Sequence, residues 1–195
     1  MATYVLIPGA GGQAWYWHRL APLLRDRGHV VVAVDLPGDD DRAGLSEYAD
    51  VVQDAIGDRI GLVVGDWWEV TGFASARAAQ AERDGRSLDD DPDLVDAFFH
   101  DVPADVTAAA MRRGAPEQSG TPFALPWPLA RWPDVPTRVL QARDDRFFPV
   151  DYQRAIAEER LGITPDEMPG GHLVALSRPA ELAERLEAYR LGLDS

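Results

Sequence analysis

Two residues in the last third of the chain carry side chains that could work together as an acid and a base. Asp145 follows the strand-like run Thr137–Gln141, and His172 lies in the glycine-rich sequence Pro169-Gly170-Gly171-His172. A carboxylate that orients a histidine makes it a general base, which can activate a nucleophile or a water molecule. A lone histidine in such a loop is more often a surface residue, so the prediction depends on the pair.

A glycine-rich loop near the start of the chain could bind a negative charge. Pro8-Gly9-Ala10-Gly11-Gly12 follows the strand-like run Thr3–Ile7, and a helix is expected after it. Backbone N–H groups in a loop of this kind can face an anion. One hypothesis is that the N–H of Ala10 or Gly11 faces the oxyanion of a tetrahedral intermediate.

Two other interpretations of this loop remain open. The spacing Gly9-x-Gly11-x-x-Ala14, with Asp35 about 20 residues further on, imitates a dinucleotide-binding fingerprint. The loop could also be a tight turn from strand to helix that only needs a glycine with positive φ.

The elements that must position these residues alternate between strand and helix. Five short runs are typical of strands: Thr3–Ile7, His29–Val34, Ile60–Val64, Thr137–Gln141 and Thr164–Met168. Apolar residues at helical spacing predict helices between them, one with Ser46 as its N-cap, one from Asp151 to Leu161, and a last one opened by Ser177 and Pro179. This order predicts an α/β fold with a mainly parallel, doubly wound sheet of about five strands. The other histidines, His18, His29 and His100, are expected to be structural.

The middle of the chain has no predicted strand. Ala74–Arg83 and Pro103–Arg113 have helical patterns, and a segment rich in proline and tryptophan follows. We interpret residues 66–135 as a helical lid within a single domain that spans residues 1–195. The acidic runs Asp39–Asp41 and Asp89–Asp91 lack the spacing of a calcium loop and are interpreted as solvated turns.

The composition excludes several classes of function. The chain has 195 residues, no cysteine and a formal net charge of −14, and all its basic residues are arginines. Disulfides and thiolate metal sites are therefore excluded. A strongly acidic protein repels phosphate backbones and anionic lipids, so neither a nucleic acid nor a membrane is an expected partner. No apolar run is long enough to cross a bilayer and no signal peptide is recognised, which predicts a cytoplasmic protein.

Four motifs in this order resemble the α/β hydrolase family, in its bacterial form, over nearly the whole chain. They are Ile7–Gly12 with Trp15 and Trp17, Asp35-Leu36-Pro37-Gly38, Arg143–Pro149, and Pro169–Leu173 followed by Ser177-Arg178-Pro179. The resemblance implies that Asp145 is the acid of a catalytic triad, His172 its base and Ala10 an oxyanion donor. It also implies hydrolysis of a small ester, amide or related substrate without a metal or organic cofactor. Pro8 stands where many members have histidine.

The nucleophile of that family is absent from the sequence. Members carry a serine in a Gly-x-Ser-x-Gly elbow after the third central strand, and no serine here has that context. Compared with the family pattern, the elbow, the helix after it and the next strand are missing from this sequence, as after a deletion. Five strands would remain, in the order 2-1-3-4-5 if the fourth fills the gap. This departure predicts little or no serine-type activity.

Asp66 is the alternative nucleophile. Haloalkane dehalogenases and epoxide hydrolases of this family use the aspartate of an Asp-Trp-Gly elbow, and Val63-Val64-Gly65-Asp66-Trp67 is similar to it. The carboxylate would form an ester intermediate that water activated by His172 hydrolyses. Trp68 stands where glycine normally allows the helix to pack, which favours assigning this stretch to the lid.

Two non-hydrolase interpretations remain. One is a dinucleotide-binding module built on Gly9–Ala14 and Asp35, which leaves Asp145 and His172 without a role. The other is a non-catalytic protein that holds an apolar ligand with aromatic residues of the lid. Those residues are Trp67, Trp68, Phe98, Phe99, Trp127 and Trp132. The expected partner is a small-molecule substrate or ligand, and the sequence leaves the oligomeric state open.

Overall fold

The structure, a computed structural model, describes most of the chain outside the middle segment. It covers residues 1–57, the backbone of 61–65, residues 94–114, 117–126 and 134–192, and the single residues 78, 81, 82, 85 and 132. The chain divides into two compact units, which are described separately. Unit 1 comprises Met1–Trp68, Ala108–Arg131 and Pro179–Ser195, and unit 2 comprises Glu69–Thr107 and Trp132–Arg178.

Unit 1 is built on a parallel three-stranded sheet in the order β2-β1-β3. Its strands are β1 (Thr3–Ile7), β2 (Val30–Ala33) and β3 (Gly61–Gly65). Thr3 pairs with Val30 on one side and with Gly61 on the other. The central strand β1 is buried almost completely, as expected for a parallel strand covered on both faces.

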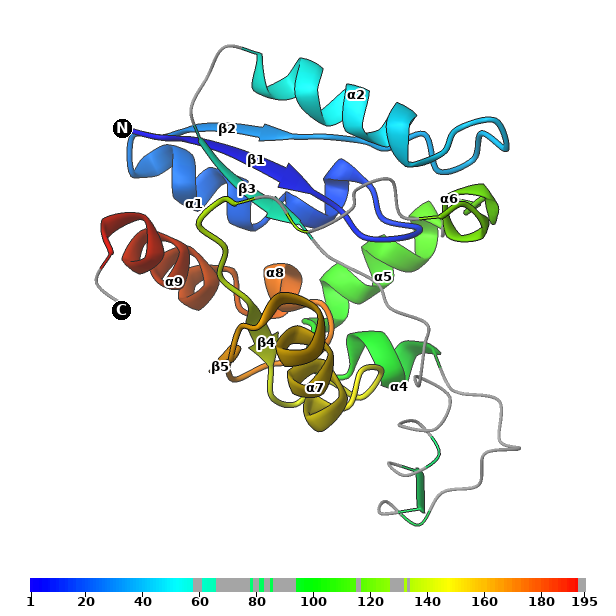
Figure 1. The fold of residues 1–195 in the computed structure, drawn as a ribbon. Helices are drawn as coiled ribbons and strands as arrows, with labels where there is room; N and C mark the ends of the chain where they lie inside the picture. The colour runs from blue at the N-terminus through cyan, green and yellow to red at the C-terminus, as the bar shows by residue number, and fades with distance from the viewer. Residues whose placement is uncertain are drawn as a thin grey trace. The chain divides into compact units, whose positions relative to one another are not determined.

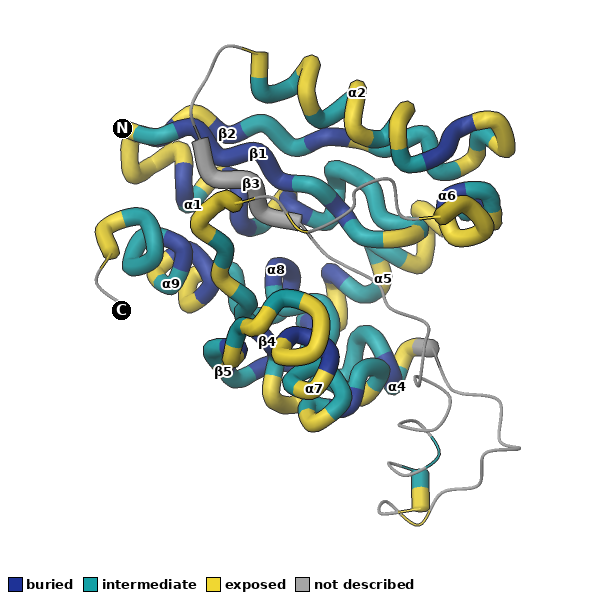
Figure 2. The backbone as a smooth tube through the Cα atoms, viewed as in Figure 1, coloured by how far each residue is buried: buried dark blue, intermediate teal, exposed yellow. Residues whose placement is uncertain are grey.

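Helices cover both faces of this sheet, as Figure 1 shows. The short 3-10 helix η1 (Ala14–Trp17) leads into α1 (Leu20–Asp26), which packs against α9 (Pro179–Leu191) on one face. Helix α2 (Leu45–Ile56) lies on the other face. The buried residues of unit 1 are concentrated in β1, α1 and α9 (Figure 2). Unit 1 also contains most of α5 (Ala104–Arg113) and α6 (Thr121–Ala124).

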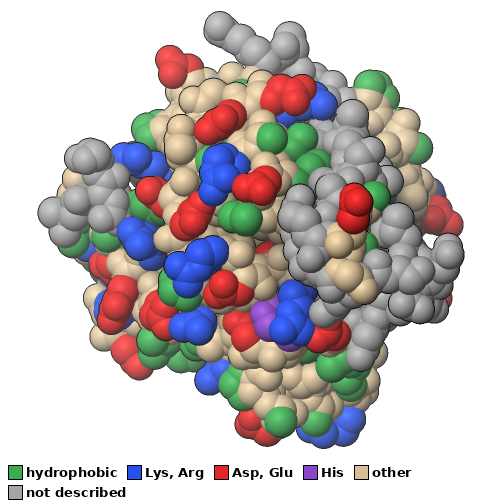
Figure 3. Space-filling model, turned by 90° about the horizontal axis from the view of Figure 1, so that it is seen from below, with side chains coloured by type: hydrophobic (Ala, Val, Ile, Leu, Met, Phe, Trp, Pro, Cys, Tyr) green, Lys and Arg blue, Asp and Glu red, His purple; other side chains and the backbone are tan. Residues whose placement is uncertain are grey.

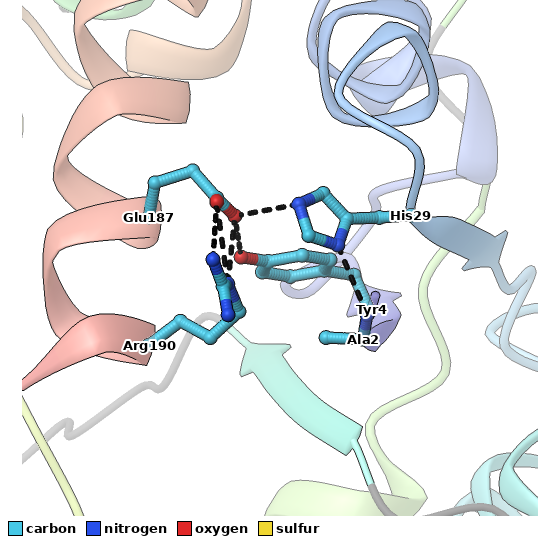
Figure 4. Close-up of polar contacts among 5 residues, drawn as sticks. All are labelled: Ala2, Tyr4, His29, Glu187 and Arg190. Carbon is cyan, nitrogen blue, oxygen red and sulfur yellow. Dashed lines mark hydrogen bonds and ion pairs between the residues drawn. The ribbon is translucent and has the colours of Figure 1, made fainter.

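A polar cluster joins the first strand to the last helix of unit 1 (Figure 4). The Tyr4 hydroxyl donates a hydrogen bond to Glu187, and His29 Nε2 lies 3.1 Å from Glu187 Oε1. Arg190 donates to both carboxylate oxygens of Glu187, and the Ala2 N–H donates to His29 Nδ1 at 3.0 Å. Burial raises the pKa of Glu187, but hydrogen bonds from Arg190 and Tyr4 and the nearby positive charges outweigh it and lower the pKa to about 2.

Unit 2 contains a parallel two-stranded sheet. Its strands are β4 (Leu140–Ala142) and β5 (Asp166–Met168), and Gln141 pairs with Glu167. Helix α7 (Val150–Leu161) connects them and packs against β4, and α8 (Val174–Ser177) follows β5. Helix α4 (Leu94–Phe99) and the start of α5 complete the described part of this unit.

Most of the predicted elements are found, with shifts at their ends. Helix α2 begins at Leu45, so the predicted N-cap role of Ser46 is wrong. Glu47 accepts the Gly44 N–H at 2.8 Å instead, and Ser46 lies inside the first turn. The predicted helix end at Gly162 is confirmed, with φ +66 in the left-handed region.

The five parallel strands confirm the α/β class, but they are distributed over two sheets. The predicted order holds within each sheet, and no pairing joins β3 to β4 in the part of the chain that the structure describes. Among the described residues, no helix has the length and hydropathy needed to span a bilayer.

Candidate active site

Asp145 lies in the loop after β4, where its carboxylate organises the backbone that follows it. Its Oδ1 accepts hydrogen bonds from the N–H groups of Phe147, at 2.7 Å, and Phe148, at 2.9 Å. Aspartate commonly closes turns in this way. The side chain is only 5% exposed, and the turn leaves Oδ2 available for a second partner.

That partner is His172, in the loop after β5. His172 Nδ1 lies 3.0 Å from Asp145 Oδ2, and the histidine side chain is 12% exposed. Because a carboxylate only accepts hydrogen bonds, the proton of the neutral ring is on Nδ1 and the basic nitrogen is Nε2. The structure therefore brings together the two side chains that the sequence pairs, in the geometry of an acid that orients a general base.

The loops that carry Asp145 and His172 are tied to each other through their backbones. The Gly170 N–H donates to Asp144 Oδ2 at 3.0 Å, and the Asp144 N–H donates to the Gly170 carbonyl at 2.9 Å. The hydrogen bond from Gly170 lowers the pKa of Asp144, with a smaller contribution from Arg143. This reciprocal pair fixes the spacing of the loops at the carboxyl ends of β4 and β5.

A third contact to this site comes from the segment after α4. The Gly171 N–H donates to Asp101 Oδ2 at 2.8 Å. Asp101 is not among the candidates selected from the sequence, because an aspartate before a helix is most often interpreted as a surface residue. Its only signal in the sequence is its position between two helices of the predicted lid.

Three phenylalanine rings surround His172. The centroids of Phe98, Phe147 and Phe148 lie 4.7, 5.3 and 5.4 Å from that of the imidazole. Phe98 and Phe147 also pack on each other at 4.4 Å. The base is therefore in apolar surroundings, where electrostatic interactions with its ring are stronger than in water.

The predicted oxyanion loop lies in unit 1. Gly11 has φ +66, which confirms that the turn needs a glycine with positive φ, and Gly12 has no room for a Cβ because one would lie 2.7 Å from Pro8 Cβ. The Gly11 N–H is already donated to Gln118 Oε1 at 2.8 Å. For the Ala10 N–H, no acceptor is found within the described ranges.

Asp35 has a structural contact in the same unit. Its Oδ1 accepts the Ala14 N–H at 2.7 Å and so ties the end of β2 to the start of η1. In the dinucleotide interpretation Asp35 would bind a ribose hydroxyl. The hydrogen bond to Ala14 gives Asp35 a structural role that needs no dinucleotide.

The other candidate residues are distributed between the described and the undescribed parts of the chain. Asp66, Trp67, Trp68 and Trp127 lie outside the described residues. Trp132 is 46% exposed, and Phe98 and Phe99 are half-buried. The structural assignment of His29 agrees with its buried contact to Glu187, and the His18 ring stacks on Trp15. His100 packs against Gly171, next to the site.

Comparison with known proteins identifies relatives of this chain. Residues 4–66 and 58–185 match the profile of the alpha/beta hydrolase family. Norfluorocurarine synthase 1 from Strychnos nux-vomica is 54% identical over 33 residues, which span 17% of this chain and only 12% of that protein.

Three solved structures are similar in fold. A methylesterase from Arabidopsis has a TM-score of 0.71 at 16% identity, covering 98% of this chain and 100% of its own. A pyrethroid hydrolase from Sphingobium faniae JZ-2 has a TM-score of 0.67 at 20% identity, covering 96% of each chain. Polyneuridine aldehyde esterase has a TM-score of 0.66 at 18% identity, covering 97% of this chain and 99% of its own. Since the two profile matches together span residues 4–185, the chain belongs to the alpha/beta hydrolase family.

Proposed function

We propose that this chain hydrolyses small apolar esters by general-base catalysis, with His172 activating water directly. The observation that carries the proposal is the hydrogen bond between His172 Nδ1 and Asp145 Oδ2, at 3.0 Å between two largely buried side chains. The esterase-type neighbours support the choice of substrate class. Direct attack by water is preferred to an acyl-enzyme because the sequence has no Gly-x-Ser-x-Gly elbow.

In the proposed reaction, His172 alone carries the proton from the attacking water to the leaving alcohol. His172 Nε2 takes a proton from water as the water oxygen attacks the carbonyl carbon of the ester. Asp145 stabilises the imidazolium that forms. The C–O bond to the alcohol then breaks, and the imidazolium returns its proton to the departing oxygen. The products are a carboxylic acid and an alcohol, and His172 is neutral again.

The aromatic surroundings of His172 favour an apolar substrate. Phe98, Phe147 and Phe148 offer apolar ring surface beside the base, which suits an ester with a short alkyl or aryl group. The oxyanion-donor roles of Ala10 and Gly11 stay predictions from the family resemblance, and the Gly11 N–H is donated to Gln118.

The test is hydrolysis of p-nitrophenyl butyrate by the wild type, His172→Ala and the matched control His18→Ala. The control is needed because an exposed imidazole can itself react with activated esters, and His18 is exposed. We expect His172→Ala to lower kcat by about 100-fold or more and His18→Ala to leave it unchanged. A His172→Ala variant that folds and keeps the wild-type rate would refute the proposal.

Two further results distinguish the alternatives. Loss of activity in Asp66→Asn, with an ester adduct visible by mass spectrometry in His172→Ala, would assign the attack to Asp66. Stoichiometric labelling of one serine by a fluorophosphonate would establish a serine acyl-enzyme instead. Stabilisation by an apolar ester without any turnover would favour a binding protein.

A further inference from the structure

We infer that Asp101 is a positioning residue, which holds His172 in line with Asp145 by accepting the N–H of Gly171. The inference rests on the proposed function only for its effect on catalysis. The geometric effect on His172 can be measured without any substrate.

The contact acts on the backbone directly before the histidine. Asp101 Oδ2 accepts the Gly171 N–H at 2.8 Å, and His172 is the next residue. A carboxylate forms strong hydrogen bonds with backbone N–H groups. With Asp144 on Gly170 and Asp145 on His172, three consecutive residues of this loop each bind a different carboxylate.

The packing at Gly171 leaves little room for the loop to move. A Cβ on Gly171 would lie 2.4 Å from His100 Cε1 and 2.7 Å from Asp101 Oδ1. His100 and Asp101 therefore lie directly against the glycine backbone. Displacing this loop would break the hydrogen bond from the Gly171 N–H to Asp101. It would also open a gap beside Asp101 Oδ1, a buried oxygen that has no hydrogen-bond partner in the described parts of the chain.

The segment that carries Asp101 is itself fixed at two points in unit 2. Asp96, in α4, forms an ion pair with Arg146, which is adjacent to Asp145 in the sequence. Phe98, in the same helix, packs edge-on against the His172 ring with an interplanar angle of 86°. The segment therefore contacts both the ring of His172 and the backbone before it. These contacts hold Asp101 against the N–H of Gly171.

The experiment compares Asp101→Asn, Asp101→Ala and Asp101→Leu with the wild type. Asparagine keeps an acceptor oxygen and removes the charge, whereas alanine and leucine remove the acceptor. Leucine retains most of the side-chain volume, so it keeps the test valid if the alanine variant does not fold. The matched control is Asp105→Ala, an exposed carboxylate four residues further along the chain.

The first measurement is the proton NMR signal of His172 Nδ1–H, assigned by its absence in His172→Ala. We expect this signal to be sharp and downfield in the wild type, Asp101→Asn and Asp105→Ala, and broadened or lost in Asp101→Ala and Asp101→Leu. The second measurement is ester hydrolysis, in which the same two variants should lose about 10- to 100-fold in kcat with KM changed by less than about twofold.

The outcomes separate the two hypotheses. An unchanged signal in folded Asp101→Ala or Asp101→Leu would overturn the positioning role, and so would an equal loss in Asp101→Asn. If the wild type hydrolyses no ester but the signal depends on Asp101 as expected, the proposed function fails and the positioning role stands.

Discussion

At the scale of single residues, carboxylates that accept backbone N–H groups organise the candidate site. Asp144 binds Gly170, Asp101 binds Gly171, and Asp145 closes its own turn while it binds His172. Each of these contacts holds a loop backbone or a side chain in place, so a substitution of the aspartate acts on geometry as well as on charge.

Asp145→Asn tests the charge of the acid while keeping most of its shape. Asn can still accept the N–H groups of Phe147 and Phe148, but it cannot stabilise an imidazolium as a carboxylate does. We expect kcat for ester hydrolysis to fall by about 100-fold or more, with little change in melting temperature. Activity assays and thermal unfolding on one preparation check both, and an unchanged kcat would contradict the assigned role.

Gly171→Ala tests the close approach of His100. The new Cβ would meet His100 Cε1 at 2.4 Å, so either the ring or the loop must move. We expect the free energy of unfolding to fall by about 1–3 kcal/mol, the usual cost of overpacking, and the ester rate to fall as well. Gly120→Ala is the control in urea unfolding, because nothing lies within 4 Å of the position that its new Cβ would take and its φ is −73. Equal stability of the two variants would be the contrary result.

At the scale of elements, the two ends of unit 1 are joined by one buried polar cluster. Helix α9 contributes Glu187 and Arg190, β1 contributes Tyr4, and His29 directly precedes β2. Burial and the adjacent Glu187 raise the pKa of Tyr4, so its hydroxyl remains a donor at neutral pH. The carboxylate of Glu187 is the acceptor that all these contacts share.

Acid should weaken this junction. The pKa of Glu187 is lowered from 4.5 to about 2 in the folded chain, so its stabilising contribution is complete above about pH 4.5 and is lost as the pH falls toward 2. In Glu187→Gln this contribution is absent at every pH. We therefore expect the stability difference between wild type and variant, measured by urea unfolding, to shrink from pH 6 to pH 3. A difference that stays constant over that range would exclude Glu187 as the titrating group.

At the scale of the whole molecule, the dominant feature is the negative charge. The chain carries 33 acidic and 19 basic residues. Acidic and basic side chains are interspersed on the face shown in Figure 3. Local ion pairs such as Arg154 with Glu167 coexist with a net repulsion over the whole chain.

Salt should therefore stabilise the protein. Screening at 0.3 M salt reduces repulsion between exposed carboxylates beyond a few ångströms, while buried pairs such as Asp145–His172 are affected less. We expect the melting temperature to rise by about 2–5 °C between 20 mM and 300 mM NaCl at pH 7.5. Differential scanning calorimetry measures this directly, and a decrease with salt would mean that attractive surface pairs dominate.

Much of the fold follows from local patterns that the sequence displays. Apolar residues at helical spacing select α1, α2 and α9, and a valine-rich run selects β2. Gly162 ends its helix because a left-handed residue is needed there. The parallel arrangement follows from the alternation of strands and helices, because the helix after each strand carries the chain back to the edge where the next strand begins.

The pairing of Asp145 with His172 could also be predicted, because each follows a strand of the same parallel sheet. The roles of Asp101, Gln118 and Glu187 could not. Each contacts a residue about 70 to 180 positions away in the sequence, and no local spacing encodes such a contact. Short-range periodicity fixes which residues form helices and strands. Long-range packing decides which carboxylate accepts which N–H, and it decides that the Gly11 N–H is donated to Gln118. It also decides that the five strands form two sheets.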